Sequence, residues 1–332
     1  MTPLFWDTVV GHQAPLSQLR RLIDRRSAPH ALIFSGPPAV GKRTVARAFA
    51  AALLTDGGSD AKTEEKLRLI GSGNHPDLHW VTKEPGKKDI PVETVRSMCS
   101  AIRLKPYYSA SSVVILDNAH EMSLAASNSL LMTLEEPTQN SYLILVTHAP
   151  QRLPATILSR CQSVHFGELS PKELTEILAR VLPQDLDKKA AHALVELCTG
   201  CLEALELDAF VNPTTLRVDD TSDLRAHLTT LVDRTVRLKR TIDNILSSDS
   251  VSAQSAVTLA STLSAEADDL PLGWRLLNQK LRTELRRAAP GRRSYWAGLL
   301  ELSLDAEKLT FERNANAQLQ LTTLLLHGTD DR

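Results

Sequence analysis

The sequence has few aromatic residues, few cysteines and no excess of charge of either sign. Aromatic side chains make up 4% of its 332 residues, which argues against a base-stacking platform for nucleic acid. Lysine and arginine total 38 against 39 acidic residues, so binding to nucleic acid would need a local basic patch or a partner chain. The 4 cysteines are too few for a disulfide framework in a chain of this size.

Long apolar runs are also missing. No stretch approaches the roughly 20 apolar residues of a membrane span. Residues 1–7 lack the charged and apolar regions of a signal peptide. We therefore expect a cytoplasmic protein.

The first half of the sequence alternates short apolar runs with helical patterns. This alternation is typical of an α/β fold, in which a parallel sheet is connected by crossover helices. We expect strands at 31–35, 78–82, 113–117, 142–147 and 163–166, and helices at 16–26, 43–54, 92–104 and 125–134.

A glycine-rich run follows the first expected strand. Gly36 and Gly41 flank a four-residue spacer, and Lys42 and Thr44 open the next helix. Glycines let such a loop wrap closely around phosphates, and the lysine adds positive charge at the positive end of the helix dipole. The strand–loop–helix context predicts a P-loop nucleotide fold, in which Gly36, Gly41, Lys42, Arg43 and Thr44 are candidate nucleotide-binding residues.

Two positions depart from an active P-loop ATPase. Arg43 stands where a serine or threonine would hold Mg²⁺, although Thr44 is one residue away. Asp117 ends an apolar strand and is placed to act near the metal of a nucleotide, but Asn118 follows it. A neutral amide is no general base, so we expect Asn118 to be a degenerate catalytic position.

The second half has no strand-like alternation. Ser170 and Glu173 form a capping box at the start of a helix, which indicates a domain boundary near Gly167. We expect a nucleotide-fold domain at 1–168, a helical lid at 169–212 and an all-helical C-terminal domain at 213–332. The expected helices are 171–182, 186–197, 224–246, 257–267, 272–287, 295–309 and one capped by Asn316.

Two further runs carry a family resemblance. Residues 126–137 read Ala-Ser-Asn-Ser-Leu-Leu-Met-Thr-Leu-Glu-Glu-Pro, and residues 153–161 read Leu-Pro-Ala-Thr-Ile-Leu-Ser-Arg-Cys. Together they resemble the AAA+ subunits of sliding-clamp loaders, and within these the delta-prime subunits of bacterial DNA polymerase III. Val10-Gly11-His12, Asn74-His75-Pro76-Asp77 and the tail from Asn314 extend the resemblance over most of the chain.

The resemblance implies a role for Arg160. In clamp loaders the arginine of Ser-Arg-Cys acts as an arginine finger, which reaches the nucleotide of a neighbouring subunit. A guanidinium suits this role because it is planar and permanently charged. The alternative for Arg160 is a salt bridge within its own chain.

The resemblance also implies partners and a mode of action. They are gamma/tau-like ATPase subunits and a delta-like subunit in a hetero-pentameric clamp loader, with the sliding clamp and primed DNA reached through the complex. We expect a component of the DNA polymerase III holoenzyme without independent catalysis, holding ATP or ADP without turnover or no nucleotide. The C-terminal domain would join the subunits in a collar. The alternative is an active gamma/tau-like ATPase.

Relatives of the delta-prime type commonly carry a four-cysteine zinc module after the P-loop helix. The corresponding segment here, 55–74, contains no cysteine. We expect no metal in it, and a plain loop or helix that forms an exposed polar excursion from the core.

Overall fold

The structure is a computed structural model that describes most of the chain. The described residues are Trp6, 9–55, 61–84, 86–181, 194–195, 197–198, 200–202, 205, 221–246, 253–263, 269–313 and 315–330. They belong to two compact units, one within Met1–Gln184 and Cys198–Leu224, the other within Asp185–Leu197 and Arg225–Arg332.

The first unit is built on a five-stranded parallel sheet. Its strands are β1 (Ala31–Ser35), β2 (Leu78–Val81), β3 (Ser112–Leu116), β4 (Ser141–Thr147) and β5 (Gln162–His165), arranged in the order β2-β3-β4-β1-β5. All five lie within one residue of the ranges expected from the sequence. The expected α/β class with a parallel P-loop sheet is confirmed.

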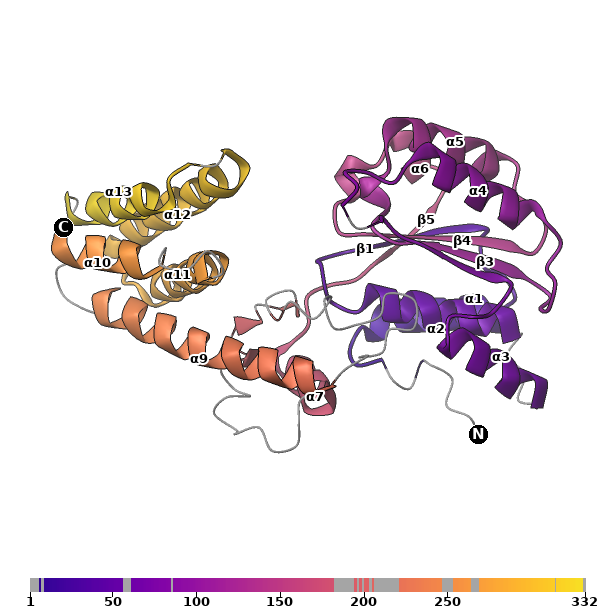
Figure 1. The fold of residues 1–332 in the computed structure, drawn as a ribbon, viewed down its shortest axis with the longest axis horizontal. Coiled ribbons are helices and arrows are strands. Elements are labelled where there is room, and N and C mark those ends of the chain that lie inside the picture. The colour runs from indigo at the N-terminus through magenta and orange to yellow at the C-terminus, as the bar shows by residue number, and fades with distance from the viewer. Residues whose placement is uncertain are drawn as a thin grey trace. The chain divides into compact units, whose positions relative to one another are not determined.

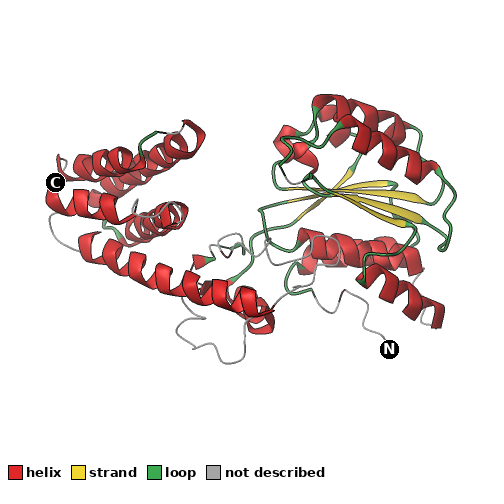
Figure 2. Cartoon of the chain, viewed as in Figure 1, coloured by secondary structure: helices red, strands yellow, loops and turns green. Residues whose placement is uncertain are grey.

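Helices cover both faces of this sheet. Figure 1 shows α4, α5 and α6 on one face and α1, α2 and α3 on the other, and Figure 2 shows the sheet between the two helical layers. Their bounds are α1 (Gln13–Asp24), α2 (Lys42–Thr55), α3 (Ala61–Gly71), α4 (Val92–Arg103), α5 (Leu124–Glu135) and α6 (Ala155–Leu158).

Burial on both faces explains why the sequences of the central strands are unbroken apolar runs. Every residue of β1 and β3 is buried, whereas the edge strands β2 and β5 are partly exposed. A strand covered by helices on both faces has no solvent side, so its sequence does not alternate. The carboxyl ends of β1 and β3 therefore lead from a rigid core into the P-loop and into Asp117.

The polar segment after α2 is only in part an exposed excursion. Its residues 61–71 form α3, which buries Leu67 and Ile70. The polar composition concealed these two apolar positions, which are spaced for one helical face. The expectation of an exposed excursion was wrong for this helix.

The capping box is present at the start of α7 (Pro171–Val181). The Ser170 backbone N–H donates to Glu173 Oε2 at 2.7 Å, and the Glu173 N–H donates to Ser170 Oγ at 3.3 Å. The Ser170 hydroxyl, which donates to Glu173 Oε2 at 2.7 Å, and then the Ser170 backbone N–H lower the pKa of the Glu173 carboxyl. The helix begins at the residue that the sequence predicted.

The second unit is helical. Its elements are α9 (Thr221–Leu246, of which the first residues belong to the first unit), α10 (Ala253–Leu263), α11 (Asp269–Arg287), α12 (Arg293–Arg313) and α13 (Ala317–Asp330). Asn316 caps α13 as predicted, since the Leu319 N–H donates to its Oδ1 at 2.9 Å.

Buried polar contacts hold α11 against α12. Ser303 Oγ donates to Asn278 Oδ1 at 2.6 Å, and Asn278 Nδ2 donates to Glu307 Oε2 at 2.8 Å. Because each group has its partner, this network fixes the register of the two helices instead of weakening the core.

The division into three domains stays a prediction. Most of the helix expected at 186–197 lies outside the described residues, as does most of 203–220. Within the described part of the chain, no helix is long and apolar enough to cross a membrane.

Candidate functional site

The P-loop connects β1 to α2, and two glycines shape it. Gly36 has a φ of +144° and Gly41 a φ of +100°, which are conformations that side-chain-bearing residues rarely adopt. A Cβ at Gly36 would clash with the backbone oxygen of Phe166, whereas a Cβ at Gly41 would meet nothing within 4 Å. Gly36 is therefore required both by its φ and by the close approach of the chain after β5.

Lys42 folds back onto the loop. Its side chain is buried, and Nζ donates to the carbonyl oxygen of Gly36 at 2.8 Å and to that of Pro37. The ammonium group thus lies inside the curve of the loop, where the charge of a phosphate would be neutralised.

Two contacts from distant segments hold the middle of the loop. His12 Nε2 lies 2.7 Å from the carbonyl oxygen of Val40, and the Leu202 N–H donates to the carbonyl of Ala39 at 3.1 Å. The His12 ring also packs edge-on against Phe166. The Val-Gly-His run and the segment at 200–202 therefore both support the P-loop.

Arg43 and Asp117 form an ion pair next to Lys42. Arg43 Nε lies 2.6 Å from Asp117 Oδ2, and the Asp117 side chain is only 1% exposed. The other carboxylate oxygen, Oδ1, accepts the backbone N–H of Asn118 at 2.9 Å. Asn118 itself has a left-handed conformation, with a φ of 49°. The residue that departs from the P-loop pattern therefore binds the aspartate that should face the metal.

These residues do not fit Mg²⁺. A magnesium site needs oxygen ligands, and Arg43 offers none where a hydroxyl is expected. Among the residues that the structure describes, no group of three His, Cys, Asp or Glu side chains could hold a metal ion. Thr44 lies half-buried in the first turn of α2, one residue beyond the usual ligand position.

Two histidines lie at the carboxyl end of β4. His120, in the short helix η2 (Ala119–Glu121), is buried, and its Nδ1 lies 3.1 Å from Thr147 Oγ1. The His148 ring packs against it with the centroids 4.0 Å apart. Burial, followed by the proximity of His148, lowers the pKa of His120 to about 4. His120 is thus a neutral ring at neutral pH.

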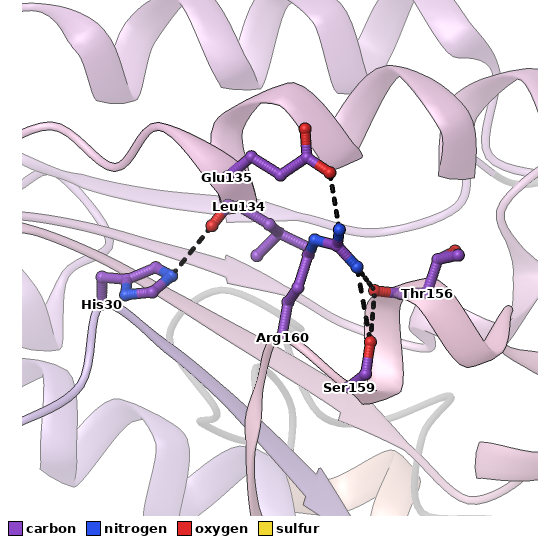
Figure 3. Close-up of polar contacts among 6 residues, drawn as sticks. All are labelled: His30, Leu134, Glu135, Thr156, Ser159 and Arg160. Carbon is purple, nitrogen blue, oxygen red and sulfur yellow. Dashed lines mark hydrogen bonds and ion pairs between the residues drawn. The ribbon is translucent and has the colours of Figure 1, made fainter.

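Arg160 has an exposed side chain, and Figure 3 shows its guanidinium next to Glu135, Thr156 and Ser159. Its Nη2 forms an ion pair with Glu135 Oε1 at 2.7 Å, and the two side chains are 37% and 53% exposed. Its Nη1 donates to the Thr156 carbonyl at 3.1 Å and to Ser159 Oγ at 3.4 Å. The guanidinium is therefore held at the surface by its own chain.

Buried neighbours fix the backbone around Arg160. The next residue, Cys161, packs against the core, and burial raises the pKa of its thiol to about 12. The carbonyl of Leu134, next to Glu135, lies 3.2 Å from His30 Nε2 (Figure 3). Both partners of the ion pair thus project from well-packed segments.

The structure joins some of the predicted site residues and not others. Gly36, Lys42, Arg43 and Asp117 lie together, joined by the Lys42–Gly36 hydrogen bond and the Arg43–Asp117 ion pair, while Arg160 makes its polar contacts with α5 and α6. The sequence interpretation missed the supporting contacts of His12, Glu135 and His120. His12 is part of a run that was already noted, so that run was the available signal, whereas nothing local marks the other two.

Comparison with known proteins finds that residues 11–170 match the model of the family described as "DNA polymerase III, delta subunit". The chain is 33% identical over 187 residues to DNA polymerase III subunit delta' of Bacillus subtilis, covering 56% of this chain and 55% of that one. It is 35% identical to subunit delta' of Pseudomonas aeruginosa, covering 58% and 57%. It is also 33% identical to subunit tau/gamma of Haemophilus influenzae, covering 59% and 28%.

The chain thus spans little more than half the length of the delta' relatives that it matches. The family match covers the residues that form the parallel sheet, and the relatives include both delta' and tau/gamma subunits. These findings support a delta-prime-like clamp-loader subunit.

Proposed function

We propose that this delta-prime-like clamp-loader subunit takes part in the ATP-dependent loading of a sliding clamp during DNA replication. It would do so as a chain that stimulates hydrolysis in a neighbouring subunit and does not hydrolyse ATP itself. The nucleotide that it acts on would lie in a gamma/tau-like partner, to which this chain is also related.

The exposure of the Arg160 guanidinium is the observation that carries this proposal. A finger must reach across a subunit boundary, so its charge must lie at the surface, as that of Arg160 does. In the assembled complex, Arg160 would exchange Glu135 for the γ-phosphate bound by the neighbour. The phosphate carries more negative charge than one carboxylate, which favours the exchange.

The chain's own pocket supports the second half of the proposal. Asn118 stands where a carboxylate would polarise the attacking water, and an amide does not accept a proton. Gly36, Gly41 and Lys42 retain the loop and its positive charge, so the phosphates of ATP or ADP would bind without turnover.

The C-terminal residues 213–332 would join the chain to its partners in a collar. In support of this, the second unit has exposed large apolar side chains that are available to a partner: Val236, Val257, Leu302, Leu304, Phe311 and Leu319. The partners would be gamma/tau-like subunits and a delta-like subunit in a hetero-pentamer that reaches the clamp and primed DNA. The cytoplasm would be the compartment, because the template is there.

Reconstitution tests assembly. The full-length chain, mixed with a gamma/tau-like and a delta-like protein, should form one complex of defined mass. Phe311→Glu should weaken this complex, whereas Leu104→Glu, at an exposed leucine of the first unit, should not. A chain that remains monomeric in the mixture would rule out the proposed partners.

An active gamma/tau-like ATPase is the second candidate, favoured by the intact Lys42 and by the identity to tau/gamma. Steady-state hydrolysis by the purified chain separates the two. Turnover of about 1 s⁻¹ or faster, within the range of ordinary enzymes, would establish the ATPase. The proposed function requires no hydrolysis above that of an Arg43→Ala, Lys42→Ala double variant.

A further inference from the structure

The pocket contains a fixed positive charge at the place where P-loop proteins hold a metal ion. In these proteins the hydroxyl after the P-loop lysine and the aspartate at the end of the neighbouring strand both face Mg²⁺. The two corresponding positions here are Arg43 and Asp117, whose Nε and Oδ2 atoms lie 2.6 Å apart. The guanidinium is thus bound directly to the carboxylate that would face the metal.

The surroundings of Asp117 disfavour the binding of a divalent ion. Its carboxylate is almost wholly buried, and its second oxygen already accepts the Asn118 N–H. The charge of the carboxylate is balanced by Arg43, and Lys42 Nζ adds another positive charge on the Gly36 and Pro37 carbonyls. A dication entering this pocket would meet two fixed cations and one neutralised carboxylate.

The phosphate-binding part of the pocket is nevertheless retained. The loop keeps both glycines with positive φ, and α2 begins at Lys42 with its amino end at the loop. A phosphate group is attracted there by backbone N–H groups and by the lysine, and this attraction needs no metal.

We propose that Arg43 takes the place of Mg²⁺ in this pocket, so that it binds the phosphates of a nucleoside diphosphate or triphosphate without a divalent metal. Mg²⁺ would not raise the affinity, and the metal-bound form of a nucleotide would have no advantage over the free form. This inference concerns the chain's own pocket and does not depend on Arg160, so it can fail while the proposed function stands.

Fluorescence anisotropy with N-methylanthraniloyl-ADP tests the proposal on the full-length chain. The dissociation constant of the wild-type chain should be no lower in buffer with Mg²⁺ than in buffer with EDTA, because the chain binds the metal-free nucleotide. Arg43→Thr restores a hydroxyl and frees Asp117, so this variant should bind the probe about tenfold more tightly with Mg²⁺ than with EDTA. Arg96→Thr, at an exposed arginine of α4, is the control and should behave as the wild type does.

Mn²⁺ electron paramagnetic resonance in the presence of ADP gives a second measurement. Wild-type protein should not immobilise Mn²⁺ in the mixture with ADP, and Arg43→Thr should immobilise the ion. Asp117→Asn added to Arg43→Thr should abolish this effect. Circular dichroism establishes that each variant is folded, and Arg43→Ser replaces any threonine variant that is not.

Three results would overturn the proposal. The first is a tenfold gain in wild-type affinity on addition of Mg²⁺, and the second is an immobilised Mn²⁺ in the wild-type chain. The third is the absence of probe binding by the wild-type chain in both buffers, which would mean that the pocket of Arg43 binds no nucleotide.

Discussion

Arg160 and Glu135 are joined by an ion pair of 2.7 Å that connects the Ser-Arg-Cys run to the Leu-Glu-Glu-Pro run. Both side chains are exposed, and an exposed pair stabilises a fold by only about 0–1 kcal/mol. The ion pair thus orients the guanidinium, and breaking it would cost the protein little stability. A resting contact of this kind is compatible with a finger that engages a partner's phosphate.

Arg160→Ala should lower the DNA-stimulated ATPase rate of the reconstituted complex without affecting assembly. The nucleotide site that faces this chain should lose about 10³-fold or more of its hydrolysis rate, because a cation that stabilises the transition state is removed. The total rate should fall by the share that this site contributes. Phosphate release measures the rate, and size-exclusion chromatography with light scattering measures assembly.

Arg180→Ala is the matched control for that experiment. Arg180 is exposed and forms an ion pair with Glu176 at the same 2.7 Å, but it lies on α7 outside the Ser-Arg-Cys run. An equal loss of rate in the two variants, or no loss with Arg160→Ala, would contradict the finger assignment.

Glu135→Gln should change the free energy of unfolding by less than about 1 kcal/mol, because the pair that it breaks is exposed. Urea denaturation measures this quantity. A loss of several kcal/mol in the free energy of unfolding would mean that the Arg160–Glu135 pair stabilises the fold. Such a pair is too strong for a finger that must leave Glu135 to reach a phosphate.

Arg43→Ala should destabilise the first unit by about 2–3 kcal/mol, because it leaves the buried Asp117 carboxylate without its cation. The double variant Arg43→Met, Asp117→Asn should recover much of this loss, since it removes both charges. Urea denaturation of the three proteins forms the comparison. Equal stability of the single variant and the wild type would show that the pair contributes nothing.

Gly36→Ala should cost about 2–4 kcal/mol of stability and Gly41→Ala about 1–2 kcal/mol. Both glycines have positive φ, but only at Gly36 would the added methyl group meet the backbone of Phe166. Thermal unfolding monitored by circular dichroism ranks the two variants. The reverse order would refute the close approach of the P-loop to the segment after β5.

Stability should fall as the pH drops from about 6.5 to about 4, in part because of His120. The pKa of His120 is lowered from 6.5 to about 4 in the folded chain, through burial first and then through His148, Lys42 and Arg152, with Glu121 acting in the opposite direction. In this window the unfolded chain binds a proton at His120 and the folded chain does not. The contribution of His120 to the free energy of unfolding, about 2–3 kcal/mol, is therefore fully present above about pH 6.5 and is lost as the pH falls to about 4.

The free energy of unfolding, measured across this window, should depend less steeply on pH in His120→Gln than in the wild type. His79→Gln, on the edge strand β2, is the control and should keep the wild-type slope. An unchanged slope in His120→Gln would remove His120 as the titrating group.

Local sequence signals located most elements because they depend on neighbours in the chain. Unbroken apolar runs marked β1 and β3, which are buried on both faces. The Ser170 and Glu173 pattern marked the start of α7, and Asn316 marked that of α13. The short helix α6 was not predicted, and neither was the burial of α3, where a polar composition concealed two buried positions.

The sequence by itself determined the P-loop, the departures at Arg43 and Asn118, and the two runs that relate the chain to clamp-loader subunits. Only the tertiary structure decided what those departures do. Arg43 meets Asp117 because the sheet order β2-β3-β4-β1-β5 brings the carboxyl ends of β1 and β3 to the same edge of the sheet, and Arg160 meets Glu135 because α6 packs against α5. Pairings of this kind follow from the packing of the whole sheet, and no local period or spacing encodes them.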